Sequence, residues 1–232
     1  MDKAIAERII EARASRQPVA LVTVLASGVQ RLVASGKDVG FGDAVSEAFR
    51  RDRSGTVETA EGEVFIRVYN PPLRMLIIGA VHTAQFLLPL ARMLDYDITI
   101  IDPRGAFATD ERFPDVKLIA EWPDEVLPQL GLDARTAMIA LTHDPKIDDV
   151  ALRLALVSDC FYIGALGSTR THAKRLERLK AGGITDEALA RIHAPIGIDI
   201  GAQGPAEIAL SIMSQVTSVL RGKRMSASAQ SA

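Results

Sequence analysis

The sequence has almost no cysteine, and this scarcity removes several classes of protein. Its single cysteine, Cys160, can form no internal disulfide bond and cannot supply the several thiolates of a cysteine-rich zinc site. Such sparing use of cysteine is typical of a reducing compartment. Cys160 precedes the apolar segment 161–163, so we interpret it as a small core residue rather than a reactive thiol.

The sequence also lacks a charge excess and a long apolar run. Its formal net charge is −2, whereas nucleic-acid-binding proteins usually carry a strong basic excess. No apolar run approaches the ~20 residues that span a bilayer. Residues 1–10 are charged and lack the apolar core of a secretion signal. We therefore expect a cytoplasmic protein that binds neither nucleic acid nor a membrane.

What the sequence does contain is enough apolar material for a core, divided by a stiff connector. Hydrophobic residues make up 48% of the 232 residues and charged residues 24%, which is ordinary for a globular protein. The segment Asn70-Pro71-Pro72 interrupts regular structure. We predict a small α+β region over residues 1–72, a larger domain over 73–223, and a disordered tail over 224–232, where the residues are mostly small and polar.

The N-terminal region shows both helical and strand patterns. Asp2 is expected to cap a helix that places Ile5, Ile9 and Ile10 on one face. Segments 19–26 and 29–34 are expected to pair as a hairpin, and residues 42–51 to form a helix. Residues 63–69 alternate in the manner of a strand, with Val64, Ile66 and Val68 on one side.

Residues 73–223 alternate between strand and helix patterns. Helical stretches separate short apolar runs, and this alternation predicts a Rossmann-like α/β fold, a parallel sheet with helices on both faces. A last helix carries an apolar stripe expected to pack against the sheet, with Pro205 in its first turn. The predicted strands are 73–78, 98–101, 116–120, 137–141 and 161–165; the helices are 83–94, 125–130 and 148–157; the stripe is Ile208, Ile212, Val216 and Leu220.

The first candidate site is the loop Gly79-Ala80-Val81-His82. It follows a predicted strand and opens a predicted helix, as a dinucleotide-binding loop does. Asp102 ends the next strand, where a ribose-binding carboxylate belongs. Val81 departs from the fingerprint, which needs glycine there so that phosphate can approach the backbone. The helix N-terminus still favours an anion, and the alternative is a tight turn without a ligand.

A second strand-to-helix loop runs from Gly164 to Arg170. Ser168 or Thr169 can cap the following helix, and Arg170 adds a positive charge. Lys174, Arg175 and Arg178 are expected to extend a basic face along that helix. The pattern fits an anion site equally as well as an ordinary capped helix with a solvated basic face.

Two further loops carry polar residues. His143 follows a strand, where polar groups face the ligand crevice of this fold, and Asp148 and Asp149 nearby make a Mg²⁺ site imaginable. The loop 193–201 has turn residues but also isoleucines, so we expect it to be packed. It holds His193 and Asp199 either as part of a site or as turn residues of a connector.

Taken together, these motifs resemble the C-terminal domain of the xanthine dehydrogenase accessory (XdhC/CoxI) family. The similarity covers nearly all of residues 73–221 and is carried by segments 76–112, 141–144, 162–170 and especially 193–201. It implies an accessory protein that binds molybdenum cofactor, shields it, and assists its insertion into the apo-enzyme subunit of a molybdenum hydroxylase such as xanthine dehydrogenase. A cysteine desulfurase is a further candidate partner, and a homodimer is left open.

The chain departs from this family in its N-terminal region. Many members carry a Ser-Gly-Gly-Cys segment there, whereas residues 1–72 contain no cysteine, so a cofactor-sulfur role for that segment is not carried over. No residue set has the pattern of an activated nucleophile with its base, which favours a carrier over an enzyme. The residues assigned to cofactor binding are Gly79, Ala80, Val81, His82, Asp102, Arg104, His143, Gly167, Ser168, Arg170, His193 and Asp199.

Two other functions remain open from the sequence. An NAD(P)-dependent oxidoreductase would use Asp102 to bind the adenosine ribose, with His143 or His193 as the acid. Arg104 leaves the choice between the two nicotinamide cofactors undecided. The other function is that of a Rossmann-like module that interacts with a partner and binds no ligand.

Overall fold

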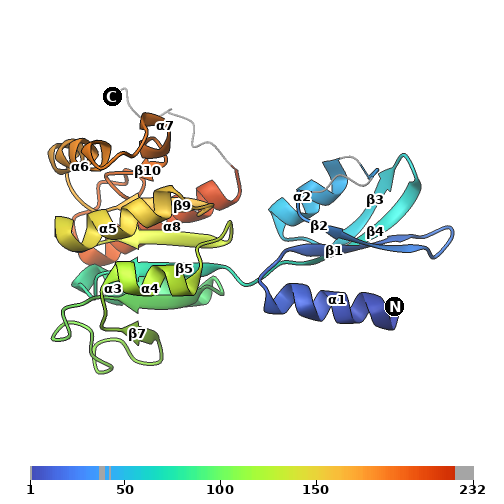
Figure 1. Ribbon diagram of the computed structural model, residues 1–232, viewed down its shortest axis with the longest axis horizontal. Coiled ribbons are helices and arrows are strands. Elements are labelled where there is room, and N and C mark those ends of the chain that lie inside the picture. The colour runs from blue at the N-terminus through green and yellow to red at the C-terminus, as the bar shows by residue number, and fades with distance from the viewer. Residues whose placement is uncertain (1, 37–39, 42, 223–232) are drawn as a thin grey trace. The chain divides into compact units, whose positions relative to one another are not determined.

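The computed structural model describes residues 2–36, 40–41 and 43–222 (Figure 1). The contacts divide the chain into two compact units, Met1–Pro71 and Pro72–Ala232. The expected boundary, after Pro72, lies one residue from this division. That each unit is a domain of its own stays a prediction. The predicted tail, residues 224–232, lies outside the described residues. None of the helices in the described segments has the length and apolar character needed to span a membrane.

The first unit is a four-stranded antiparallel sheet with two helices. The strand order is β2-β1-β4-β3, so the predicted hairpin of the first two strands is confirmed. The elements are α1 (Lys3–Ala14), β1 (Val19–Val24), β2 (Gln30–Ala34), α2 (Asp43–Arg51), β3 (Gly55–Thr59) and β4 (Gly62–Tyr69).

Side-chain burial in the first unit follows most of the predicted pattern. Val64 and Ile66 are buried on one face of β4, as its alternation predicts. In α1, Ile9 is buried but Ile10 is 68% exposed, so the prediction for Ile10 is wrong. One residue turns a helix by about 100°, and Ala12, three residues after Ile9, takes the inward position. β3 was not predicted; it is an exposed edge strand without the apolar alternation of a half-buried strand.

The second unit is a six-stranded parallel sheet of order β10-β9-β8-β5-β6-β7. Every strand pair is parallel, and Ile78 at the end of β5 pairs with Ile101 of β6 and Ala140 of β8. This is the Rossmann strand order, so the predicted fold class is confirmed. The elements are β5 (Arg74–Ile78), α3 (His82–Met93), β6 (Asp97–Ile101), β7 (Lys117–Ile119), α4 (Pro123–Leu130), β8 (Thr136–Ala140), α5 (Pro145–Leu156), β9 (Tyr162–Ala165), α6 (Thr169–Ala181), α7 (Asp186–Leu189), β10 (Ile192–His193) and α8 (Pro205–Leu220).

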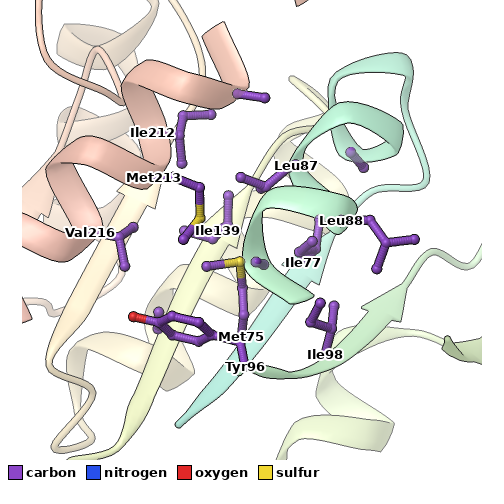
Figure 2. Close-up of a cluster of buried hydrophobic side chains, with 14 of the residues drawn as sticks. Met75, Ile77, Leu87, Leu88, Tyr96, Ile98, Ile139, Ile212, Met213 and Val216 are labelled. Carbon is purple, nitrogen blue, oxygen red and sulfur yellow. The ribbon is translucent and has the colours of Figure 1, made fainter. Parts of the chain in front are cut away.

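Helices cover both faces of this sheet. On one face α3 and α8 enclose an apolar core in which Ile212 and Val216 meet Ile77 and Ile139 of the strands (Figure 2). The predicted stripe of α8 is therefore confirmed, with Ile208 and Leu220 partly buried at its ends. On the other face α4 and α5 pack over Leu76, Ile78 and Met138, and α6 joins them through Leu179 (Figure 1). Cys160 is buried there as a core residue.

The strand order reverses between β5 and β8. In open α/β sheets, ligands bind beyond the carboxyl ends of the strands at this reversal. Because the strands are parallel, the loops after β5, β6, β8 and β9 all emerge at one edge of the sheet. The fold thus brings the candidate residues from Gly79 to Arg170 to a common edge.

Candidate functional site

The loop after β5 packs closely on the loop after β8. Gly79 has a φ of +111°, and an added Cβ would lie 2.7 Å from Cγ2 of Thr142 and 3.3 Å from its backbone nitrogen. Glycine is therefore required for both its conformation and its contact. Val81 is the N-cap of α3 and offers no side-chain hydrogen bond, while exposed His82 lies beside the ring of Phe86, with centroids 5.1 Å apart.

Asp102 is wholly buried behind this loop and uses both oxygens on its own chain. One carboxylate oxygen accepts from the backbone nitrogen of Ala80 and from Nη2 of Arg104, each at 2.8 Å. The other accepts from the backbone nitrogen of Arg104 at 3.0 Å and from its Nε at 2.9 Å. A ribose hydroxyl would have to replace one of these donors. Asp102 therefore acts first as a clamp between the loops after β5 and β6.

The charge of Asp102 is stabilised within this clamp. Burial alone would raise the pKa of the carboxyl, but hydrogen bonds from Arg104 and Ala80 outweigh it and hold the pKa below its usual value. Arg104 is one-third exposed, and its guanidinium lies 4.7 Å from the ring centroid of Phe107. The clamp thus forms one charged but internally satisfied corner of the sheet edge.

A cavity of about 220 Å³ lies between α5 and α6, the helices that follow the neighbouring strands β8 and β9. It brings together His143 of the loop after β8 and Arg170 of the first turn of α6. Gly79, Asp102, His193 and Asp199 do not line it. Its walls are His143, Pro145, Asp148 and Asp149 from the α5 side, and Arg170, Thr171, Lys174, Arg175 and Arg178 from α6.

Arg175 is the unexpected member of this wall. It lines the same wall as Arg170, Lys174 and Arg178, as the predicted basic face requires, but its side chain is only 2% exposed, so the alternative of a solvated face does not hold for this residue. Arg175 lies four residues before buried Leu179 and therefore projects to the same inward face of α6. Its Nη2 donates to the carbonyl oxygen of Leu166 at 2.9 Å, while Nε and Nη1 have no acceptor among the described residues. The i,i+4 spacing to Leu179 was the sequence signal for this burial.

The two acidic residues of the cavity are already bound by the protein. Asp148 is 1% exposed and accepts from the Thr142 backbone nitrogen at 3.2 Å, the Thr142 hydroxyl at 2.7 Å and the His143 backbone nitrogen at 3.0 Å. Asp149 pairs with Arg178 at 2.5 and 3.1 Å. No group of three or more His, Cys, Asp or Glu residues in the described ranges could hold a metal ion. The hydrogen bonds and the ion pair that occupy Asp148 and Asp149 give the magnesium alternative no support.

The loop after β8 holds His143 in an unusual conformation. Its φ is +62°, in the left-handed region, where Asp148 secures its backbone N–H. The imidazole is exposed and lines the cavity, while Asp144 caps α5 by accepting from the Lys146 backbone nitrogen. A strained residue held at the mouth of a cavity is typical of a binding loop.

The loop after β9 forms the predicted helix cap. Ser168 accepts from the Thr171 backbone nitrogen at 3.2 Å, which confirms its capping role. Gly167 has a φ of +136°, and an added Cβ would meet Cγ2 of Thr171 at 3.1 Å. Arg170 follows in the first turn of α6 with its side chain exposed.

His193 and Asp199 belong to a packed loop rather than to the cavity. The His193 ring stacks on Tyr162 at 4.8 Å and 5°, and burial lowers its pKa. Asp199 is exposed and accepts from the Gly201 backbone nitrogen at 3.2 Å. The side chain of Gln215 bonds both backbone groups of Gly197, at 2.9 and 3.0 Å. The predicted packing of this loop is confirmed, and sequence analysis missed Gln215 because it lies on α8.

Comparisons with known proteins agree on one family. Residues 75–216 match the family model described as the XdhC Rossmann domain. The chain is 33% identical over 151 residues to the molybdenum cofactor insertion chaperone PaoD of Escherichia coli, covering 65% of this chain and 41% of that protein. It is 29% identical over 154 residues to a probable xanthine dehydrogenase subunit of Bacillus subtilis, covering 66% and 44%. The chain thus spans less than half the length of these relatives.

A solved structure shares the fold over nearly the whole chain. A crystal structure described as a xanthine dehydrogenase from Bacillus halodurans superposes with a TM-score of 0.67 at 23% identity. The match covers 97% of this chain and 66% of that one. At this identity the likeness establishes the fold alone.

Proposed function

The chain belongs to the XdhC Rossmann-domain family, and we propose on that basis that it assists the insertion of molybdenum cofactor into a molybdenum hydroxylase. The observation that carries the proposal is the similarity to PaoD, which is named as a chaperone for this insertion. The apo-enzyme subunit of the hydroxylase is the proposed partner. A cysteine desulfurase, a homodimer and a cytoplasmic location are parts of the same proposal.

We propose a carrier rather than an enzyme. The single cysteine, Cys160, is 4% exposed, and burial raises the pKa of its thiol. A buried, protonated thiol is a poor nucleophile, so Cys160 is unsuited to accept or transfer sulfur. The chain's contribution is then to bind the cofactor, exclude water from it and release it to the partner.

The proposed cofactor site is the carboxyl edge of the parallel sheet. His82, His143 and Arg170 are exposed there and can donate hydrogen bonds to a pterin or a phosphate. The backbone of the loop before α3 would contact the cofactor through Gly79, Ala80 and Val81. The loop before α6 would do so through Gly167 and Ser168. Asp102 and Arg104 support this edge through the clamp. His193 and Asp199 contribute least to the proposal, because the first is stacked on Tyr162 and the second bonds its own loop.

An NAD(P)-dependent oxidoreductase is the alternative from the sequence. Asp102 would have to exchange Arg104 or Ala80 for a ribose hydroxyl, and Val81 stands where the pyrophosphate approaches glycine. Both features weaken the expected affinity for a dinucleotide.

The test is direct binding of cofactor and partner. We expect the purified chain to retain molybdopterin in gel filtration, detected by mass spectrometry of the bound fraction, and to capture a molybdenum hydroxylase subunit. We also expect hydroxylase activity to fall in cells that lack the chain. Absence of molybdopterin binding together with unchanged hydroxylase activity would contradict the proposal. Saturable binding of NADH or NADPH without molybdopterin would favour the oxidoreductase.

A further inference from the structure

We infer that the cavity between α5 and α6 is an anion site that holds a phosphate group of the bound ligand. The site lies between the loops after β8 and β9, away from the loop after β5 that usually holds phosphate in this fold. The inference rests on the proposed function only for the identity of the molecule to which the phosphate group is attached. The site itself follows from charge, burial and unmet hydrogen bonds.

The cavity carries more positive than negative charge. Four cationic side chains line it against two carboxylates, and both carboxylates are engaged by the protein. Asp148 accepts three hydrogen bonds from the loop after β8, and Asp149 is paired with Arg178. Arg170 and Lys174 are exposed and have no ion-pair partner among the described residues. The field at the cavity therefore favours an anion.

Arg175 is the residue that points most strongly to an anion site. Burying a guanidinium is unfavourable unless acceptors and an opposite charge compensate it. Arg175 has one hydrogen bond to a carbonyl oxygen and an ion pair with Asp148, whose oxygen lies 3.9 Å from Nη2, too far for a second hydrogen bond. Two of its nitrogen atoms are left without an acceptor among the described residues, which is rare for buried polar groups. A phosphate in the cavity would compensate this buried charge.

The size of the cavity limits what it can hold. A volume of about 220 Å³ is below the roughly 300–1,000 Å³ of sites that enclose a whole small-molecule ligand. It suits one phosphate-sized part of a larger molecule, with the remainder lying outside the cavity near exposed His143. The first turns of α5 and α6 add the positive ends of two helix dipoles.

The loop after β5 is the weaker place for a phosphate. The backbone N–H of Ala80 donates to Asp102, so a donor that a phosphate would use is already taken. The buried carboxylate of Asp102 would also repel a second anion at short range. The cavity between α5 and α6 also contains two carboxylates, but four cationic side chains line it with them, and two nitrogen atoms of Arg175 have no acceptor among the described residues.

Isothermal titration calorimetry of the full chain with inorganic pyrophosphate at low ionic strength tests this site. We expect saturable binding to the wild type and a tenfold or larger loss in the double variant Arg170→Ala/Lys174→Ala, whose substituted side chains are exposed and lie outside the core. Arg175→Met should abolish binding. The matched control is Lys180→Ala, on the same helix but paired with Asp186, and it should stay within twofold of the wild type.

Repeating the titration with molybdopterin separates this inference from the proposed function. Weaker pyrophosphate and molybdopterin binding in the double variant supports both. Pyrophosphate binding without molybdopterin binding leaves the anion site standing and contradicts the proposed function. Molybdopterin binding that the double variant leaves unchanged supports the proposed function and overturns the anion site. No pyrophosphate binding to the wild type, or equal binding to the wild type and the double variant, also overturns it.

Discussion

Two buried aspartates at the same edge of the parallel sheet differ in the hydrogen bonds and cationic partners that stabilise their charges. Asp102 and Asp148 each accept backbone N–H groups of a neighbouring loop. Arg104 gives Asp102 three hydrogen bonds and keeps one-third of its side chain in solvent. Arg175, beside Asp148, is buried and has two nitrogen atoms without an acceptor among the described residues. The first corner is thus closed on itself, whereas the second has capacity for a ligand.

The largest expected effect is on the closed corner. Asp102→Ala removes four hydrogen bonds and leaves the Ala80 N–H unpaired, so we expect the free energy of unfolding to fall by about 3 kcal/mol. Urea denaturation measures this change. Asp199→Ala, at an exposed turn, is the control and should cost less than about 0.5 kcal/mol. Equal effects of the two variants would mean that Asp102 is not a clamp.

The contact between the two corners can be broken at Gly79. Gly79→Ala forces a side chain into a positive φ and against Thr142, so we expect a loss of about 2 kcal/mol in the free energy of unfolding. Gly105→Ala is the control, because an added Cβ there meets no atom within 4 Å. A Gly79→Ala protein as stable as the wild type would show that the loops after β5 and β8 can separate freely.

Arg175→Met sharpens the contrast because it should affect stability little. The replacement removes a buried charge whose desolvation is poorly compensated and retains much of the side-chain volume, but it also removes the ion-pair partner of buried Asp148, so we expect a loss of about 1 kcal/mol, smaller than that of Asp102→Ala. Asp148 keeps its three hydrogen bonds in this variant. Thermal and urea unfolding measure the change. A loss comparable to that of Asp102→Ala would assign Arg175 a structural role.

The smallest expected effect is an opposite pH dependence of the two corners. The pKa of Asp102 is lowered, so its stabilisation is complete above about pH 4 and is lost as pH falls through its folded value. Burial raises the pKa of Asp148, and hydrogen bonds from Thr142 offset this effect only in part. The contribution of Asp148 to stability therefore weakens as pH rises from about 4 through the pKa of the folded protein.

Asparagine variants should separate these two contributions. We expect Asp102→Asn to flatten the acid side of a plot of unfolding free energy against pH, and Asp148→Asn to flatten the side above about pH 4. Urea unfolding at a series of pH values gives both curves. The same change in slope for both variants would contradict the distinction between the corners.

Much of the fold could be predicted because it depends on local patterns. The apolar runs at β5, β6, β8 and β9 and the spacing in α8 follow from burial on one or both faces. β3 and β10 escaped prediction, since an exposed edge strand and a two-residue strand have little pattern of their own.

The site was less predictable because it depends on contacts between distant elements. Asp102 was placed correctly at a strand end. That both of its carboxylate oxygens accept from the Arg104 guanidinium depends on side-chain conformation and could not be predicted. Arg175 was placed on the basic face that lines the cavity, but its burial was not predicted, although its spacing to Leu179 indicates it. His143 lies near α6 because β8 and β9 are neighbours in the sheet. No sequence motif indicates that these two strands are neighbours.

The cavity between α5 and α6, and not the loop after β5, is the expected place of the anion. Amide ¹H–¹⁵N spectra recorded during a pyrophosphate titration test this most directly. We predict saturable shifts at His143, Thr171 and their neighbours, with little change at Ala80 and Val81. Shifts confined to Ala80 and Val81 would contradict the claim.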